Sequence, residues 1–354
     1  MRRDILELDA RVAPTVQALH IDLQDAESVR LLLTGESVID WQRLALHDLD
    51  AVDRFLACHG LRMDDPEDHE RLRYVFNEAV SYLEEHLHLR FPRELRDPED
   101  VRLVFLWASQ FGGFRRTQIL SCVILKLMHV IHHMEAADLK FKTAVSEEQL
   151  LELAQRSLLQ TANAMQEAGL NVLAFYGNRK SRSAVITKLL AKRESVAATI
   201  FDKLRFRVVV ETEDDLLPAI AWLTRHAFPF NYVIPDQSHN NLLPLGRIID
   251  SLTAADRPAY QTFDHEHEDE GPRNEFSGAT YRTINWITDY PVRIPASTPG
   301  VFSFELGRVV FVMVEFQLID EATARRNEEG DNAHALYKAR QHRVVASRLK
   351  RGAR

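Results

Sequence analysis

The residues VVFVMVEFQL at positions 309–318 form the clearest strand signal in the chain. Apolar residues fill both alternating sets of positions, and this pattern predicts a strand that is buried on both faces of a sheet. Glu315 interrupts the run, and an unpaired carboxylate in such a strand is strongly destabilising. We therefore expect another group to compensate the charge of Glu315.

Further strands and helices surround this run in mixed order. The run FRVVVE at 206–211 predicts a second buried strand, and additional strand signals lie at 230–234, 281–287 and 302–306. Helical patterns occupy 183–193, 214–223 and about 321–348. Strands interspersed with helices predict an α/β or α+β domain. We expect the α+β class, with a β-sheet flanked by helices.

The first 145 residues show helical patterns only, because no alternating β-branched run occurs before about residue 205. Ser146 and Gln149 form a capping box that opens a further helix. The polar stretch 236–277, with HEHEDEG in its middle, predicts a loop or insertion. We therefore predict an all-helical domain at 1–145 and a sheet-containing domain at 146–354.

The composition is that of a globular protein. Of 354 residues, 45% are hydrophobic and 27% are charged, which excludes disordered and low-complexity classes. Two cysteines, Cys58 and Cys122, cannot build a disulfide framework or a four-cysteine zinc site, so we expect a reducing, cytoplasmic location. The most apolar run, 119–131, is too short to span a bilayer. We therefore expect no membrane association.

Charge is distributed unevenly along the chain. Residues 1–100 hold 23 acids and 12 bases, and the whole chain has a net charge of −8, so the remainder sums to +3. Residues 176–208 contain nine bases against two acids, and the last seventeen residues contain seven bases and no acid. Because a positive field concentrates phosphates, the second half is expected to bind an anionic ligand. The simpler alternative for either block is a solvated helix face.

Two carboxylates lie beside the two strongest strand signals. Glu315 interrupts one strand, and Asp202 directly precedes the other, followed by Arg205 and Arg207. In the simpler interpretation, Asp202 caps a turn and Glu315 pairs with an arginine. In the functional interpretation, neighbouring strands bring both carboxylates together on Mg²⁺, which binds one or two acids plus substrate phosphates. Basic residues at 179–193 would then bind the remaining phosphate charge.

The segment EFQLIDEATARRNEEGDNAHALYK at 315–338 resembles the end of the synthetase domain of RelA/SpoT-type (p)ppGpp synthetases. That family shows E-x-Q-x-R-T, then E-x-G, then A-H-W-x-Y-K, and the match needs no gap. The residues in family register are Glu315, Gln317, Glu328, Gly330, Ala333, His334, Tyr337 and Lys338. A second block, IFDKLRFRVVV at 200–210, resembles the family's F-D-L-x-G-I-R-V, with Asp202 at the metal-ligand aspartate.

Upstream, Lys180 and Lys188 repeat the eight-residue lysine spacing of the family's K-S-x-x-S-x-x-x-K helix. Tyr232 matches the tyrosine of its D-Y-I-x-x-P motif. The resemblance covers about residues 176–340, roughly half of the chain.

The sequence also departs from the family pattern at several positions. Arg205 replaces the glycine of the second block, and Ile319 and Asp320 replace the R-T pair. The acceptor motif G-Y-x-S-x-H is best matched by Gly278 and then by YRTIN at 281–285, with asparagine in place of histidine. The resemblance therefore implies a retained donor half and a remodelled acceptor half.

By resemblance, the fold is a nucleotidyltransferase-like mixed sheet and the reaction is pyrophosphoryl transfer from ATP to the 3′-hydroxyl of a nucleotide. The implied metal is Mg²⁺, on Asp202 and Glu315, which are also the implied catalytic residues. The implied ATP-phosphate ligands are Arg179, Lys180, Lys188 and Arg207. The implied acceptor ligands are Tyr281, Asn285, Gln317 and His334.

The altered acceptor motif is compatible with more than one acceptor and with more than one function. GDP or GTP is the default acceptor, and an RNA 3′ end is the alternative. The second functional hypothesis is a catalytically degenerate relative that binds nucleotide or RNA as a regulatory module, motivated by Arg205 and the changed acceptor strand. Either hypothesis is compatible with a homo-oligomer.

Overall fold

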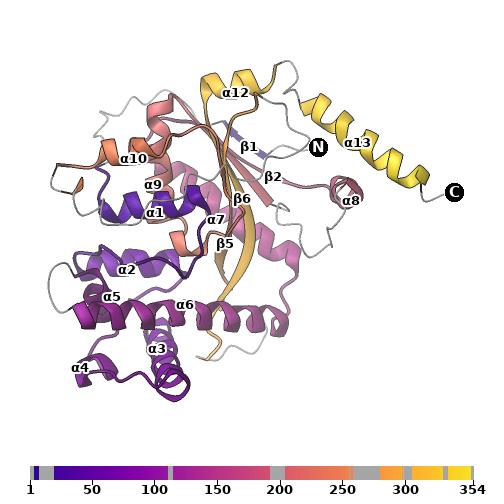
Figure 1. Cartoon of the computed structure of the whole chain (residues 1–354). Helices are drawn as coiled ribbons and strands as arrows, with labels where there is room; N and C mark the ends of the chain where they lie inside the picture. Colours follow the sequence, from indigo (N-terminus) through magenta and orange to yellow (C-terminus); the bar gives the residue numbers. More distant parts are fainter. Residues whose placement is uncertain are drawn as a thin grey trace.

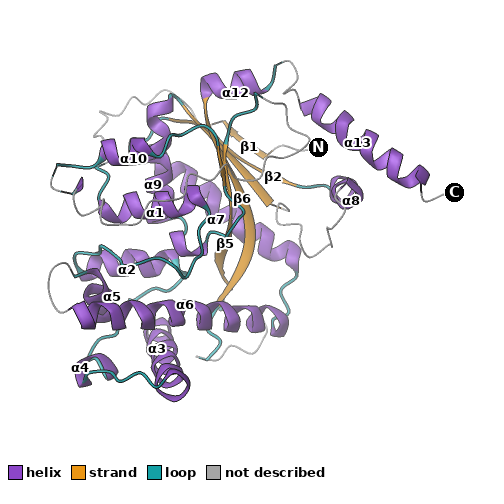
Figure 2. Cartoon of the chain, viewed as in Figure 1, coloured by secondary structure: helices purple, strands orange, loops and turns teal. Residues whose placement is uncertain are grey.

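The computed structural model describes most of the chain. It covers residues 4–7, 20–110, 115–191, 204–254, 256–257, 280–296, 298, 305–329 and 334–351, with the backbone alone at 4–7, 334–335 and 351. A sheet carries helices on one side, and a layer of helices lies below it in the view of Figure 1 (Figure 1, Figure 2). The predicted α+β class is confirmed.

The sheet has six strands in the order β1-β2-β3-β6-β5-β4. At its centre β3 (Leu204–Val210) runs parallel to β6 (Val309–Asp320), and every other pairing is antiparallel. The remaining strands are β2 (Val172–Arg179), β5 (Ile284–Arg293) and the short edge strands β1 (Asp4–Glu7) and β4 (His239–Asn240). The strands predicted at 206–211 and 309–318 are thus confirmed as the two central ones.

The helices divide into two groups along the chain. The first group is α1 (Leu23–Thr34), α2 (Leu49–Cys58), α3 (Pro66–Leu87), α4 (Arg93–Arg96), α5 (Arg102–Ser109) and α6 (Arg115–Lys142). The second is α7 (Glu147–Glu167), α8 (Arg182–Ala191), α9 (Leu216–His226), α10 (Gly246–Ser251), α12 (Glu321–Asn327) and α13 (His334–Arg351). Ser146 forms the predicted capping box with Gln149 at the start of α7.

One face of the sheet is apolar because side chains alternate along each strand. Phe206, Phe316 and Trp286 lie in register across β3, β6 and β5 and are fully buried. Trp286 stacks on Phe316 with ring centroids 5.2 Å apart. Gly177 of β2 is the register partner of Phe206. A Cβ added at Gly177 would lie 2.8 Å from the Phe206 ring. Helices α1, α7 and α9 cover this face.

A second hydrophobic core lies between α2, α3, α5 and α6. Its fully buried centre includes Val52, Phe76, Val104 and Ile124. In contrast, α1 packs with the sheet core, and β1 extends the sheet by one strand. The domain boundary at residue 145 stays a prediction.

Some segments differ from what the sequence predicts. Residues 230–234 form a 3₁₀ turn, η3 (Phe230–Tyr232), followed by one bridge from Val233 to Thr288, instead of a strand. The single terminal helix predicted at 321–348 is also wrong, since α12 ends at Asn327 and α13 begins at His334. The strand β2 was not predicted, because VLAFYGNR contains one β-branched residue and a glycine.

Two predicted segments are only partly covered by the structure. Within the expected loop at 236–277, the described part contains β4 and α10, and 258–279 lies outside the described residues. Of the strand expected at 302–306, positions 302–304 lie outside the described residues, and 305–306 form a turn.

Helix α6 is longer than the apolar run that marks it in the sequence. By length and composition alone the helix could cross a membrane. However, half of the residues in its most apolar 18-residue stretch are buried inside the protein. The helix packs against α3, α5 and β6. This burial is typical of a core helix, which passes the same composition test.

Two buried histidines, His59 at the C-terminal cap of α2 and His129 in α6, lead us to expect a loss of stability in acid. Burial lowers the pKa of His59 to about 4 and that of His129 to about 2, whereas an unfolded histidine has a pKa near 6.5. The unfolded chain therefore binds protons first, and stability falls as the pH drops from about 6.5 towards 4. At about 1.4 kcal/mol per pKa unit, His59 alone is expected to lower the free energy of unfolding by about 3 kcal/mol.

Urea unfolding across this pH window measures the effect. His59→Phe should flatten the pH dependence, whereas His342→Gln, on the exposed side of α13, should leave it unchanged. An identical pH dependence in His59→Phe and the wild type would contradict the assignment.

Candidate functional site

The second face of the sheet carries polar side chains over its central strands. Arg205 and Arg207 on β3 lie in register with Glu315 and Gln317 on β6, and Asn285 on β5 is the register partner of Gln317. Residues in register on neighbouring strands share a face. These five residues are called the polar face below. They come from three strands that the sheet alone brings together.

Glu315 is the buried centre of the polar face, with 5% of its surface exposed. Its Oε2 accepts a hydrogen bond from Nε of Arg205 at 2.8 Å and forms an ion pair with Nη2 of the same guanidinium at 2.8 Å. Its Oε1 accepts from Nδ2 of Asn285 at 2.7 Å and from Nε2 of Gln317 at 3.3 Å. Pairing with an arginine, the simpler of the two interpretations, is therefore what the structure shows for Glu315.

Arg207 is held at a second point of the polar face. Its Nη2 donates to Oε1 of Gln317 at 3.1 Å, and its Nη1 lies 3.6 Å from Oε1 of Glu328 at the end of α12. The side chain of Glu328 is 65% exposed, so this second contact is weak. The Arg207 guanidinium is thus oriented by an amide and remains partly open to solvent.

Local hydrogen bonds fix the loops that border the polar face. Asp320, one of the two residues that replace the family's R-T, caps α12 by accepting from the amide of Thr323 at 2.9 Å. The side chain of Asn327, at the end of that helix, accepts a hydrogen bond from the amide of Arg282 and donates one to the carbonyl of Arg282. Nδ2 of Asn241 donates to the carbonyl of Tyr281 at 2.9 Å. The backbone of Tyr281 is therefore anchored just before β5, and its side chain is half-buried.

The predicted phosphate ligands do not all reach the polar face. Arg179 lies on the opposite face of β2, where its Nε donates to Oε1 of Gln155 of α7 at 3.0 Å. Lys180 follows β2, and Lys188 lies on α8, a helix that packs against α13. Asp202 and the side chain of His334 lie outside the described residues.

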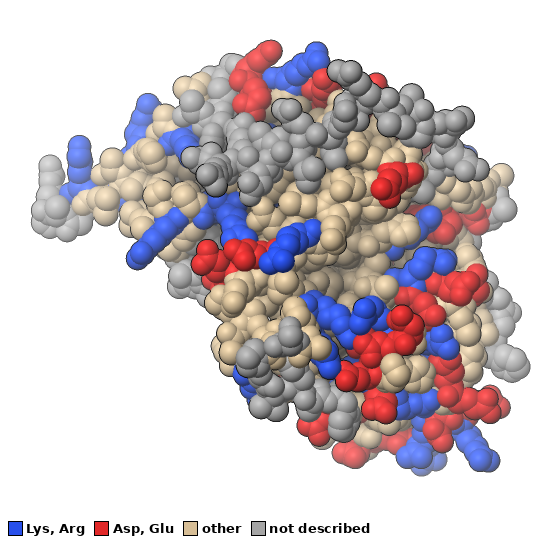
Figure 3. Space-filling view, turned by 180° about the vertical axis from the view of Figure 1, so that it is seen from behind, with Lys and Arg blue, Asp and Glu red and all other residues tan. Residues whose placement is uncertain are grey.

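Helices α8 and α13 form a basic arm beside the sheet (Figure 1). Nη1 of Arg348 on α13 donates to the carbonyl of Leu190 on α8 at 2.8 Å, which joins the two helices. The α13 sequence contains six Lys and Arg residues and no acid. Seen from behind, Lys and Arg side chains extend along this arm, whereas both signs of charge mix over the helical layer (Figure 3).

The Mg²⁺ that the sequence resemblance implies would have to bind at Glu315, in the centre of the polar face. Both Glu315 oxygens already accept hydrogen bonds. The Arg205 guanidinium lies where a metal ion bound to Glu315 would have to lie. In the part of the chain that the structure describes, no group of three or more His, Cys, Asp or Glu residues could hold a metal ion. The described side chains, in this arrangement, do not fit a divalent cation at Glu315.

Arg205 is the site residue that motif matching misses, since in the motif it is only a departure from a glycine. The available signal was alternation: positions 205 and 207 are two apart, as are 315 and 317, so each pair shares one face of its strand. Asn285 was predicted as an acceptor ligand. In the structure its amide nitrogen donates to the Glu315 carboxylate, and its role as an acceptor ligand stays a prediction.

Comparison with known proteins finds similarity only among solved structures. No family model matches the chain, and no curated protein matches it. The small alarmone synthetase 1 from Bacillus subtilis is 13% identical, with a TM-score of 0.31 over 57% of this chain and 86% of that one. The same protein bound to its product pppGpp gives 15% identity and a TM-score of 0.33 over 57% and 87% of the two chains.

The small alarmone synthetase 2 from Bacillus subtilis is 15% identical, with a TM-score of 0.32 over 59% of this chain and 98% of that one. We therefore base the functional proposal on the residues of this chain.

Proposed function

We propose that the polar face binds the phosphates of a nucleotide, and that the chain is a nucleotide-binding regulatory module. The observation that carries this proposal is the pair of arginines on β3, each held in place by a partner on β6. The planar guanidinium fork matches phosphate oxygens bidentately, and a pre-oriented fork loses less entropy on binding. The basic arm adds positive potential to the same half of the molecule.

The Arg205–Glu315 ion pair favours a role in nucleotide binding over a role in catalysis. The resemblance gives Glu315 the role of a metal ligand and catalytic group, yet its carboxylate is neutralised by Arg205 in the described structure. A nucleotide that lies on Arg205 and Arg207 needs no metal at Glu315. RNA is the larger ligand that the same basic surface would accept, since its phosphates carry the same charge.

Arg207→Gln tests this proposal directly. The change removes the charged fork but keeps a polar side chain, and a lost charge-assisted hydrogen bond of about 1.5–3 kcal/mol weakens ATP binding by about tenfold to a hundredfold. Calorimetric titration with ATP, GDP and GTP measures this change. Arg247→Gln, at an exposed arginine of α10, is the control and should bind like the wild type. Equal affinity in Arg207→Gln and the wild type would disprove the proposal.

The second proposal is the transferase that the resemblance implies: Mg²⁺-dependent pyrophosphoryl transfer from ATP to the 3′-hydroxyl of GDP, GTP or an RNA end. The observation in its favour is that Glu315 and Gln317 lie together with Arg207 on one face, as a shared site requires. Mg²⁺ at Glu315 would require Arg205 to move, and the Arg205 side chain is 39% exposed. Asp202, Lys180, Lys188, Tyr281 and His334 keep their implied roles within this proposal.

Incubation with labelled ATP, Mg²⁺ and a panel of nucleotides and RNAs separates the two proposals. Release of AMP with a 3′-modified product, abolished in Glu315→Gln, would establish the transferase. Tight ATP binding without any product would establish the binding module.

A further inference from the structure

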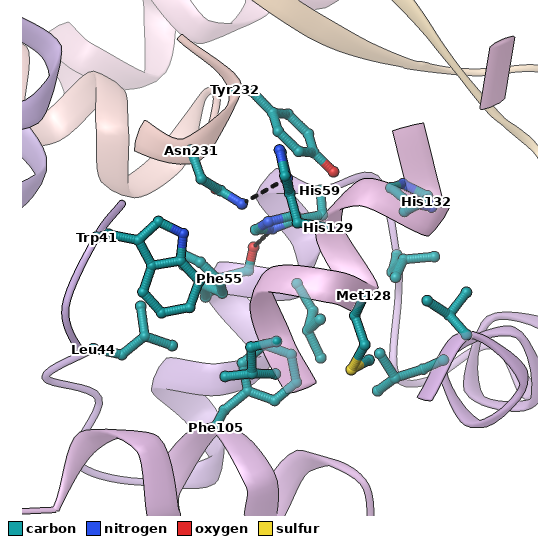
Figure 4. Close-up of a pocket in the computed structure, with 15 residues that line it drawn as sticks. Trp41, Leu44, Phe55, His59, Phe105, Met128, His129, His132, Asn231 and Tyr232 are labelled. Atoms are coloured by element: carbon teal, nitrogen blue, oxygen red, sulfur yellow. Dashed lines mark hydrogen bonds between the residues drawn. The ribbon is translucent and has the colours of Figure 1, made fainter. Parts of the chain in front are cut away.

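Helix α6 is apolar on the side that faces away from the protein core as well as on the side that faces it. On the inward side Met128, His129 and His132 line a small pocket of about 50 Å³ (Figure 4). On the outward side the structure leaves four large hydrophobic side chains exposed, Ile119 by 52%, Val130 by 39%, Met134 by 60% and Phe141 by 89%. A helix that is apolar all round is normally covered all round. We therefore expect another molecule to cover the outward side.

The outward residues form one continuous stripe, called the α6 stripe below. They share an arc of the helix surface about 60° wide and are Ile119, Val123, Val130, Met134, Ala137 and Phe141. Between the two ends of the stripe, no Asp, Glu, Lys or Arg lies within this arc. The stripe is about 33 Å long, since a helix rises about 1.5 Å per residue. Contiguous exposed apolar surface of this kind marks an interaction site.

The spacing of the α6 stripe is symmetric about Val130. Ile119 and Phe141 each lie eleven positions from Val130. Val123 and Ala137 each lie seven positions from it. A two-fold contact requires such a self-complementary surface, because every residue pair in it occurs twice. The symmetric spacing therefore favours a second copy of this chain over an unrelated partner.

The last member of the α6 stripe, Met134, has Lys126 as its counterpart eight positions away, on the other side of Val130. The Lys126 amine lies 5.6 Å from the centre of the Trp41 ring in its own chain. Its methylene stem is apolar and can pack against a methionine. The symmetry therefore holds at all three pairs of positions around Val130.

The charges at the two ends of α6 favour an antiparallel arrangement. Arg116 lies at the edge of the same arc, at the start of the helix. In an antiparallel pair it comes close to the start of α7 in the second copy, where Glu147 and Glu148 form an acidic first turn. Lys140 and Lys142 lie outside the arc. A parallel pair would instead place Arg116 beside the same arginine of the second copy.

We propose that α6 is a self-association surface, and that two copies of this chain pair antiparallel along the α6 stripe with Val130 on the two-fold axis. Phe141 of each copy then packs against Ile119 of the other. Packed helices have their axes about 8–10 Å apart, which brings the two Val130 side chains into contact. The α6 stripe shares no residue with the polar face, so this inference does not depend on the proposed nucleotide binding.

Sedimentation equilibrium of the full chain from about 1 μM to about 1 mM tests the proposal. The mass is expected to rise from 40.7 kDa towards twice this value as the concentration increases. Val130→Lys places two charges against each other and should raise the dissociation constant at least about a hundredfold. Ala346→Lys adds the same charge at an exposed position of α13 and should associate like the wild type. A monomer at every concentration, or a Val130→Lys dimer as tight as the wild type, would overturn the proposal.

Cysteine cross-linking locates the axis. Val130→Cys should form a disulfide between two copies when diamide oxidises the two thiols, since positions on the axis lie within the Cα separation of about 7 Å that a disulfide allows. Ile119→Cys and Phe141→Cys should each stay unlinked alone, because each position is about 33 Å from its own copy, but a mixture of the two should cross-link. The native Cys58 and Cys122 are buried, so the wild type should stay unlinked. Cross-linking of Ile119→Cys with itself would overturn the antiparallel pair.

A lipid bilayer is the other apolar partner that suits such a helix. The wild type is expected to stay in solution when vesicles of neutral phosphatidylcholine are sedimented. Sedimentation with the vesicles that is lost in Met134→Lys would overturn the proposal in favour of a membrane contact. Circular dichroism checks that each variant folds, and Met134→Lys, at a more exposed position, replaces Val130→Lys in the mass measurement if the latter does not.

Discussion

Replacing Arg205 by glycine, the residue that the resembling family has at this position, is expected to make ATP binding depend on Mg²⁺. In the wild type the Arg205 guanidinium neutralises Glu315, whose side chain is only 6% exposed. Without that guanidinium the buried carboxylate keeps only the amides of Asn285 and Gln317, and an uncompensated buried charge is strongly unfavourable. A divalent cation with the nucleotide phosphates then becomes the best available partner.

The expected size follows from the interaction that the cation replaces. A charge-assisted hydrogen bond contributes about 1.5–3 kcal/mol, which corresponds to about tenfold to a hundredfold in affinity. Calorimetry should therefore show ATP binding to Arg205→Gly that is at least about tenfold tighter with Mg²⁺ than without it. In the wild type the same ratio should stay within about twofold.

Matched variants separate charge from backbone freedom. Arg205→Met removes the charge at similar length and should behave like Arg205→Gly, whereas Arg205→Lys should behave like the wild type. The double variant Arg205→Gly with Glu315→Gln should lose the dependence on Mg²⁺ again. If both uncharged variants bind ATP independently of Mg²⁺, then Glu315 is not a latent metal ligand.

The central strands were predictable because their signals are local. Apolar residues at both alternating positions of 309–318 identify β6 without any knowledge of the fold. Strand β2 gave no such signal, because VLAFYGNR contains one β-branched residue and a glycine, Gly177, where an added Cβ would meet the Phe206 ring. The sequence at 230–234 predicts a strand because it is apolar. In the structure the turn η3 packs its apolar residues into a hydrophobic core instead of pairing with a neighbouring strand.

The polar face could be predicted only in part. Glu315, Gln317 and Arg207 followed from motif spacing, and one of the two weighed interpretations had Glu315 pair with an arginine. That this arginine is Arg205 follows from the register of β3 against β6. The register depends on how the two strands pair and cannot be read from the sequence of either strand alone. The small pocket lined by Trp41, His129 and Asn231 gave no local sequence signal, because these residues are far apart in the sequence and meet only through packing.

Replacing Trp286 by alanine is expected to destabilise the protein more than any other change considered above. The ring is fully buried, stacks on Phe316 at 5.2 Å and contacts Phe228 with centroids 6.1 Å apart. Removing a buried aromatic ring costs about 3–5 kcal/mol, because the lost contacts add to the cavity that remains. Denaturant unfolding should show this loss as a lower midpoint with an unchanged slope.

The position of Trp286 links this stability to the site. Its neighbour Asn285 points to the other face of β5 and holds Glu315, so the apolar face fixes the strand that the polar face uses. Trp286→Phe keeps a ring and should cost about 1–2 kcal/mol. It forfeits no hydrogen bond, since the indole nitrogen has no partner among the described residues. A loss below about 1 kcal/mol in Trp286→Ala would contradict the packing of β5 on β6, and with it the register that assembles the polar face.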